Sequence, residues 1–195
     1  MLKNSALLIF FVLILDQALK IWIKTNMMIG QEIYFFDWFI IHFIENKGMA
    51  FGWELGKGTL PKYILSVFRI IAIVFIGVYW YRLTKEVVKK GVIYSVSLIL
   101  AGAIGNMIDS AFYGMIFSES YGQIATVFDG GYSSFLQGKV VDMFYFPLIN
   151  GHLPNWFPFV GGNHFIFFRP IFNIADAAIS TGVINILLFH RSFFK

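Results

Sequence analysis

The sequence predicts an all-α integral membrane protein with a small β-structure on one face. Apolar residues make up 58% of the 195 residues and charged residues only 13%. The mean hydropathy is +0.72, which is far more apolar than an ordinary soluble domain. Four segments, at about 5–24, 62–81, 92–113 and 171–189, have the roughly 20 residues that a helix needs to cross a bilayer. We therefore expect four transmembrane helices in a single domain over residues 1–195.

The first segment begins like a secretory signal peptide, because Lys3 precedes an apolar stretch over 6–15. It lacks an A-x-A-like cleavage site, however, and the apolar character resumes through Ile21, Trp22 and Ile23. We therefore interpret it as an uncleaved first spanning helix.

The distribution of basic residues predicts the topology. The short connection between the second and third spans is rich in Lys and Arg, as are the two ends of the chain, and basic loops stay in the cytoplasm. An even number of spans then places both termini in the cytoplasm and the long segments 25–61 and 114–170 on the extracytoplasmic face. The basic residues of the short connection are Arg82, Lys85, Lys89 and Lys90.

The two long segments are too apolar to be simple linkers. "EIYFFDWFIIHFIEN" has the aromatic and β-branched residues of two short strands, and the Gly-punctuated "KGMAFGWELGKG" follows it. In 114–170, Phe and Trp alternate with Pro and Gly, which is typical of the bilayer interface. We expect a small extracytoplasmic β-cradle and loop platform that rests on the outer leaflet.

Polar residues within the predicted spans are expensive, since a carboxylate at mid-membrane costs about 2.5–3.5 kcal/mol. Asp16 and Lys20 are four residues apart on one face of the first helix, with the acid N-terminal to the base, so we expect an ion pair. Arg69 in the second helix has no evident partner in the sequence, and we expect it to snorkel toward the outer interface.

The third span carries a polar stripe, because five of its residues are three or four positions apart. Its two glycines allow another helix to come close, and its asparagine and aspartate point into the same crevice. Tight packing explains the glycines but explains the aspartate poorly. The five residues are Gly102, Gly105, Asn106, Asp109 and Tyr113.

Two further carboxylates stand out near the extracytoplasmic face. Asp176 shares a stripe with Asn173 and Ser180 at the start of the fourth span, and Asp142 lies in the apolar, β-prone "KVVDMFYF". Each aspartate alone could be a helix cap or an ion-pair partner. Brought together, two carboxylates can share one proton, so that one activates a water and the other polarises a scissile carbonyl. This is the chemistry of aspartic peptide hydrolysis.

Other chemistries are poorly supplied. The chain has no cysteine, its four histidines are scattered, and H-E-x-x-H and G-x-S-x-G are both missing. We therefore expect no metal and no cofactor. The net charge of +4 comes without a basic tract, so nucleic acid is not an expected partner.

Five stretches occur in the order of the sequence boxes of bacterial lipoprotein signal peptidase, the type II signal peptidase, and the chain resembles that family over nearly its whole length. The resemblance implies an aspartic endopeptidase of the bacterial inner membrane. Such an enzyme removes the signal peptide from diacylglyceryl-modified prolipoproteins by cutting just before the lipidated cysteine. The stretches are "DQALK" (16–20), "NKGMAFG" (46–52), "GAIGNMIDS" (102–110), "VVDMF" (140–144) and "FNIADAAI" (172–179).

By the same resemblance, Asp142 and Asp176 are the catalytic pair and act toward the periplasmic face. The implied partners are the prolipoprotein signal peptide with its diacylglyceryl cysteine and the membrane lipids, and we expect a monomer. The residues implied to line or brace the site are Asp16, Lys20, Asn46, Asn106, Asp109 and Asn173, and those of the substrate-holding β-cradle are Gly48, Ala50 and Phe51.

The match departs from the family in two places. The third-helix box usually ends in Asp-Arg, whereas Ser110 follows Asp109 here, and we hypothesise that Lys139 or Arg169 replaces the missing arginine. The regions 114–138 and 147–170 also look enlarged, and we expect both on the outer face.

Two other functions remain open on the residues. Buried carboxylates could relay protons or cations in an ion-coupled transporter, although inverted repeats and broken helices are not evident. A non-catalytic membrane scaffold is also possible, but it would leave Asp142 and Asp176 without a role.

Overall fold

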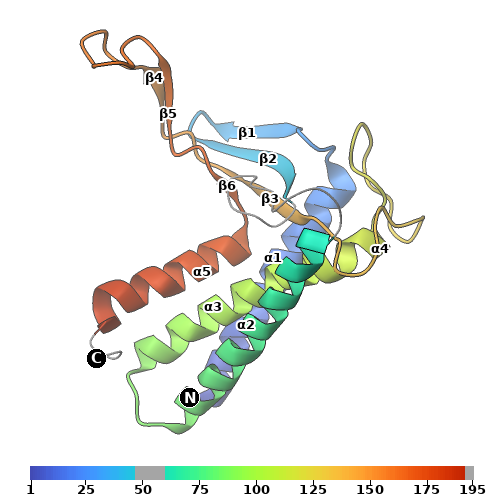
Figure 1. Cartoon of the computed structure of the whole chain (residues 1–195), viewed down its shortest axis with the longest axis vertical. Helices are drawn as coiled ribbons and strands as arrows, with labels where there is room; N and C mark the ends of the chain where they lie inside the picture. The colour runs from blue at the N-terminus through green and yellow to red at the C-terminus, as the bar shows by residue number, and fades with distance from the viewer. Residues whose placement is uncertain (47–59, 192–195) are drawn as a thin grey trace.

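The computed structural model describes residues 1–46 and 60–191 and shows a helical bundle with a small sheet at one end (Figure 1). The third helix continues through a π-helical turn and a last short α-turn. The final helix also ends in a π-helical segment. The helices are α1 (Leu2–Asn26), α2 (Leu60–Lys85), α3 (Lys90–Ile108) with η2 (Asp109–Tyr113) and α4 (Gly114–Ile116), and α5 (Ile174–Asn185) with η3 (Ile186–His190).

Three of these helices, Leu2–Asn26, Leu60–Lys85 and Lys90–Ile116, are long and apolar enough to cross a membrane. The fourth predicted span differs from the expectation at its start, because Ile171 and Phe172 form strand β6 and the helix begins only at Ile174. The apolar helix Ile174–His190 is therefore shorter than the others. The strands also mean that the fold is a helical bundle with an added β-layer rather than all-α.

The burial pattern of α1 is the reverse of that in a soluble helix. Asp16, Lys20 and Lys24 are at most 1% exposed, whereas Phe11 and Leu15 are 58% and 60% exposed. In a bilayer, polar groups must find partners inside the protein while apolar side chains face lipid. The helix therefore turns its polar stripe toward its neighbours.

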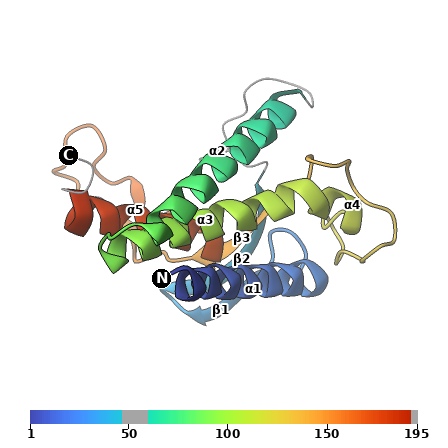
Figure 2. The same cartoon turned by 90° about the horizontal axis from the view of Figure 1, so that it is seen from below.

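Helix α3 lies at the centre of the bundle and contacts α1, α2 and α5 (Figure 2). Its glycines permit this close packing. A Cβ atom at Gly102 would lie 2.2 Å from the carbonyl oxygen of Ala175, and one at Gly105 would lie 2.8 Å from Oδ2 of Asp16. The crevice predicted beside the polar stripe of α3 is thus filled by the start of α5 and the middle of α1.

The strands form one antiparallel sheet with the strand order β1-β2-β3-β6, and a separate ribbon pairs β4 with β5. The two strands predicted in "EIYFFDWFIIHFIEN" are confirmed as β1 and β2. An apolar core that includes Ile23, Met27, Phe43 and Met143 joins the sheet to the end of α1. The strands are β1 (Glu32–Phe36), β2 (Phe39–Asn46), β3 (Val140–Tyr145), β4 (Ile149–His152), β5 (His164–Phe167) and β6 (Ile171–Phe172).

Candidate active site

Asp142 is held by the sheet. It lies in the middle of β3, opposite Ile44 of β2, and is only 3% exposed. Its carboxylate accepts a hydrogen bond of 2.6 Å at Oδ1 from Nδ2 of Asn173 and a long one of 3.4 Å at Oδ2 from Nδ2 of Asn46. Two neutral amides therefore orient this carboxylate without supplying a positive charge.

Asp176 is held by the first turn of α5. Asn173 is the N-cap of the helix, and its Oδ1 accepts the Asp176 backbone N–H at 2.9 Å, while Oδ2 of Asp176 faces the Asn173 N–H at 3.4 Å. This reciprocal arrangement is a capping box, with aspartate in the usual place of glutamate. Nδ2 of Asn106 donates to Oδ1 of Asp176 at 2.7 Å, so the side chain is fixed from two elements.

Asn173 and Asn106 connect the two carboxylates. The Nδ2 group of Asn173 faces Asp142, and it also lies 3.1 Å from Oδ1 of Asn106. Asn106 in turn donates to Asp176. The structure thus brings Asp142 and Asp176 to one site, although an aromatic segment of more than thirty residues separates them in the sequence.

Lys20 lies beneath this pair and is fully buried. Its Nζ is 2.9 Å from Oδ2 of Asp16, 2.9 Å from Oδ2 of Asp109 and 2.9 Å from Oδ1 of Asn106. An ammonium group has three N–H donors, so all three are satisfied. The predicted Asp16–Lys20 pair is therefore present, and it extends to α3.

The two acids that bind Lys20 also fix the elements that carry the catalytic candidates. Oδ1 of Asp16 accepts the backbone N–H of Ala175 at 2.9 Å, in the first turn of α5, where a negative charge is favourable. Oδ2 of Asp109 accepts the backbone N–H of Val141 at 3.2 Å, next to Asp142 on β3. Each acid therefore positions the residue beside one member of the pair.

The environment of Asp142 favours its protonated form. Burial and then the nearby negative charge of Asp176 raise the pKa of the Asp142 carboxyl to about 7. Hydrogen bonds from Asn46 and Asn173 and the charge of Lys20 oppose this shift. When burial raises the pKa of one of two neighbouring carboxyls, that group can serve as the acid while the other, ionised, serves as the base.

Gln17 and Arg69 also lie at this site, and neither was predicted to do so. Nε2 of Gln17 donates to Oδ1 of Asp109 at 2.9 Å, and the hydroxyl of Tyr113 donates to Oε1 of Gln17 at 3.2 Å. Arg69 of α2 lies within electrostatic reach of Asp109 and Asp142, as well as of Asp176. The sequence offered one indication for each: Gln17 directly follows Asp16, and Arg69 is a cation inside a predicted span.

Arg69 also bears on the family arginine that is missing after Asp109. Its Nη1 is 3.4 Å from Oγ of Ser110, so a guanidinium reaches this position from α2. Lys139 instead pairs with Glu45 and Glu119, and Arg169 is exposed. Our hypothesis that one of these two residues replaces the arginine is therefore not supported, and Arg69 does not simply snorkel.

The predicted cradle residues Gly48, Ala50 and Phe51 fall outside the described residues. Among residues 1–46 and 60–191, no group of three or more His, Asp or Glu side chains is placed to hold a metal ion.

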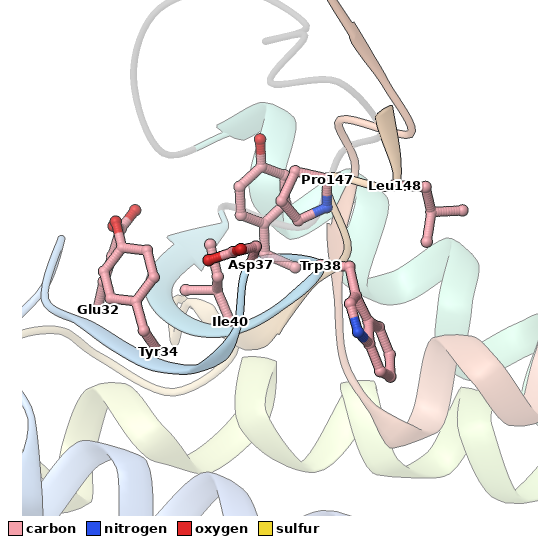
Figure 3. Close-up of a pocket in the computed structure, with 8 residues that line it drawn as sticks. Glu32, Tyr34, Asp37, Trp38, Ile40, Pro147 and Leu148 are labelled. Carbon is pink, nitrogen blue, oxygen red and sulfur yellow. The ribbon is translucent and has the colours of Figure 1, made fainter. Parts of the chain in front are cut away.

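A hollow of about 660 Å³ lies on the sheet, and Glu32, Tyr34 and Asp37 help to line it (Figure 3). Tyr145, which also lines it, is three residues from Asp142 on β3, so their side chains point to opposite faces of the sheet. The hollow is thus separate from the carboxylate pair.

Comparison with known proteins identifies the family. The model of the family "Signal peptidase (SPase) II" matches residues 8–194. A lipoprotein signal peptidase of Porphyromonas gingivalis is 52% identical over 192 residues, which cover 95% of this chain and 82% of the relative. A lipoprotein signal peptidase of Amoebophilus asiaticus is 40% identical over 184 residues, with 92% and 74% covered.

Solved structures agree with this match. A structure described as a bacterial membrane enzyme, determined by the in meso method at 2.3 Å resolution, aligns with a TM-score of 0.61 and 26% identity over 96% of this chain and 87% of that chain. A second, at 1.9 Å resolution, aligns with a TM-score of 0.57 and 27% identity. The chain therefore belongs to the signal peptidase II family of bacterial membrane proteases, which process lipoproteins.

Proposed function

We propose that this protein removes the signal peptide from diacylglyceryl-modified prolipoproteins by aspartic catalysis, cutting just before the lipidated cysteine. The observation that carries the proposal is the convergence of Asp142 and Asp176 on the shared amides of Asn106 and Asn173. The alternative of an ion-coupled transporter has no comparable feature in its favour, because these carboxylates gather at one end of the bundle.

In this mechanism Asp142 is the acid and Asp176 is the base. Asp142 is buried and its pKa is raised to about 7, so a large fraction of it stays protonated at neutral pH and can donate a hydrogen bond to the scissile carbonyl. Asp176 is half-buried and lies in the first turn of α5, where the helix end favours a negative charge. It takes a proton from the attacking water.

The remaining polar residues orient this pair. Asn106 and Asn173 hold the carboxylates, while Lys20, through Asp16 and Asp109, fixes the backbone on which both stand. When the leaving amine departs, it takes a proton from the pair, and the water's oxygen remains on the new carboxylate. We place this reaction at the outer, periplasmic end of the helices, with both termini in the cytoplasm.

The decisive experiment is to change Asp142→Asn and Asp176→Asn singly and to follow cleavage of a diacylglyceryl-modified precursor in vesicles. We expect each variant to lose about 10²–10⁴-fold in rate, the typical contribution of a general acid or base. Asp37→Asn is the matched control, because Asp37 is exposed in the hollow on the other face of the sheet. Near-normal cleavage by either catalytic variant would refute the assignment.

A further inference from the structure

A hairpin extends from the sheet and takes no part in the site described above. We call residues 147–168 the hairpin arm: it contains β4, β5 and a tip at 153–163. β4 and β5 pair only with each other, and the arm projects away from the helices, beyond the end of the sheet (Figure 1). Its strands are therefore not stabilised by the main sheet.

The composition of the hairpin arm is unusual for an exposed element. From Pro147 to Phe168 it contains no Asp, Glu, Lys or Arg. Its large apolar side chains are nevertheless uncovered, with Trp156 77% exposed and Phe159 105% exposed. The other exposed apolar side chains of the arm are Leu148, Ile149, Phe157, Val160, Phe165, Phe167 and Phe168. Such a surface needs an apolar environment.

The backbone of the tip is adapted to an environment with little water. The N–H groups of Leu153, Phe157 and Gly161 donate to carbonyl groups inside the tip, as do those of Gly162 and Asn163. The two prolines of the tip, Pro154 and Pro158, have no N–H group. Seven of the eleven residues at 153–163 therefore have no backbone donor that must find a partner in water.

Phe159 shows that the tip is shaped to present an aromatic ring. Its φ angle is +66°, in the left-handed region that glycine adopts easily and a bulky side chain does not. Backbone strain of this kind persists where the surrounding structure imposes it, and it is concentrated at functional positions. Here the result is a phenyl ring that points entirely away from the protein.

An aromatic row connects the base of the hairpin arm to the catalytic region. The ring of Phe168 lies 6.0 Å from that of Phe172, which lies 5.7 Å from Phe146 and directly precedes Asn173. Phe146 in turn stacks on Phe39 at 5.0 Å. Helix α5, with exposed side chains such as Ile184, begins beside the same base. The apolar surface of the arm is thus continuous with the lipid-facing surface of the bundle.

We propose that the hairpin arm lies in the outer leaflet of the membrane, with Trp156 and Phe159 at the boundary between headgroups and acyl chains. Trp is enriched at this depth, and Phe is a common apolar anchor of segments that lie in the interface. An isolated two-stranded ribbon has open edges, so it cannot enter the hydrocarbon centre, and the interface is the limit of its penetration. A soluble protein or a second copy of this chain would be expected to meet charged residues at the rim of such a surface, and the arm has none.

The natural absence of cysteine allows a direct test. Phe159→Cys is labelled with the fluorophore NBD, and the purified full chain is placed in vesicles that contain lipids spin-labelled either near the headgroup or near the chain end. We expect a blue-shifted emission that loses most of its intensity with the shallow label and less with the deep one. Gln123→Cys is the control, because it is exposed on a loop that carries Glu119 and Asp129, and it should remain unquenched.

The outcomes against the proposal are equally clear. Emission from Phe159→Cys that matches the Gln123→Cys control would place the hairpin arm in water and overturn it. A blue shift without lipid quenching, which weakens as protein is diluted in the membrane, would show a second copy covering the arm. Trp156→Cys gives the same readout if Phe159→Cys folds poorly. None of these measurements depends on peptidase activity, so they can fail independently of the proposed function.

Discussion

Two lysines one helical turn apart on α1 are both fully buried, yet they bind different parts of the molecule. Lys20 joins α1 to α3 through Asp109 and Asn106. Lys24 joins α1 to the sheet: its Nζ lies 2.6 Å from Oε1 of Glu45 on β2 and 2.7 Å from the Ser120 hydroxyl. Lys20 therefore binds the helix bundle, whereas Lys24, one turn later on the same face of α1, binds the sheet.

The difference lies in the charges around each lysine. Lys20 faces two carboxylates, and those acids also bind the backbone beside Asp142 and Asp176. Lys24 faces Glu45, which has a second cationic partner because Lys139 lies 2.9 Å from its Oε2. Within the described residues, removing Lys20 takes the ion-pair partner from two buried acids, whereas removing Lys24 leaves one acid that is still paired. We call Lys20 with Asp16, Asp109 and Asn106 the Lys20 cluster, and Lys24 with Glu45, Lys139 and Glu119 the Lys24 cluster. We infer that the Lys20 cluster positions Asp142 and Asp176, whereas the Lys24 cluster attaches the sheet to α1.

The largest effect is expected for Lys20→Met. Removing one partner of a buried ion pair costs about 3–5 kcal/mol, so we expect a large drop in unfolding temperature in detergent. Cleavage should be lost even in the molecules that remain folded, because α5 and β3 lose their common support. Full activity per folded molecule would contradict the role given to this cluster.

Lys24→Met is the matched comparison and should be milder. Glu45 keeps Lys139, so we expect a loss of about 1.5–3 kcal/mol, the range for a hydrogen bond to a charged group. The cleavage rate per folded molecule should stay close to that of the unmodified protein. If it falls as far as in Lys20→Met, the two clusters are not functionally distinct.

The pH dependence of cleavage separates the two regions further. Because the pKa of Asp142 is raised to about 7, kcat/KM should fall as the pH rises through about 7 and the acid loses its proton. Asn46→Ala removes a hydrogen bond that lowers this pKa, so the alkaline limb should move to higher pH. Lys24→Met should leave the limb in place, and movement in that variant would argue against separate roles.

The same group affects stability with a definite sign. The native state holds the Asp142 proton more tightly than an unfolded chain, whose carboxyl has the ordinary pKa of 3.8. Stability should therefore decrease as the pH rises from about 4 to about 7, and Asp142→Asn should remove this component from urea or thermal unfolding curves. An unchanged slope between those pH values would contradict the raised pKa.

The smallest effect is expected at the edge of the Lys24 cluster. Glu119 pairs with Lys139 at 3.1 Å, but its side chain is 49% exposed. Exposed ion pairs contribute about 0–1 kcal/mol and are screened by salt. Glu119→Gln should therefore leave the unfolding temperature nearly unchanged at high salt and leave cleavage intact. A large drop in unfolding temperature would show that the Lys24 cluster depends on its exposed residue Glu119.

Several features could be predicted from the sequence because they depend on residues close together in the chain. The apolar lengths indicated the helices, and the spacing of Asp16 and Lys20 indicated their pairing. The aromatic and β-branched run at 32–46 predicted β1 and β2. The resemblance to the family added Asp142 and Asp176, which periodicity alone could only single out as unusual acids.

The tertiary structure decided what depends on contacts between distant segments. Phe172 pairs with Phe144, so sheet formation delays the start of the fourth helix to Ile174, although the local sequence is apolar enough for an earlier start. Arg69 reaches Ser110 from another helix, a contact that no spacing along one element can predict. Periodicity depends only on residues that are close in the sequence. These contacts form only when the packed bundle and sheet bring separate segments together.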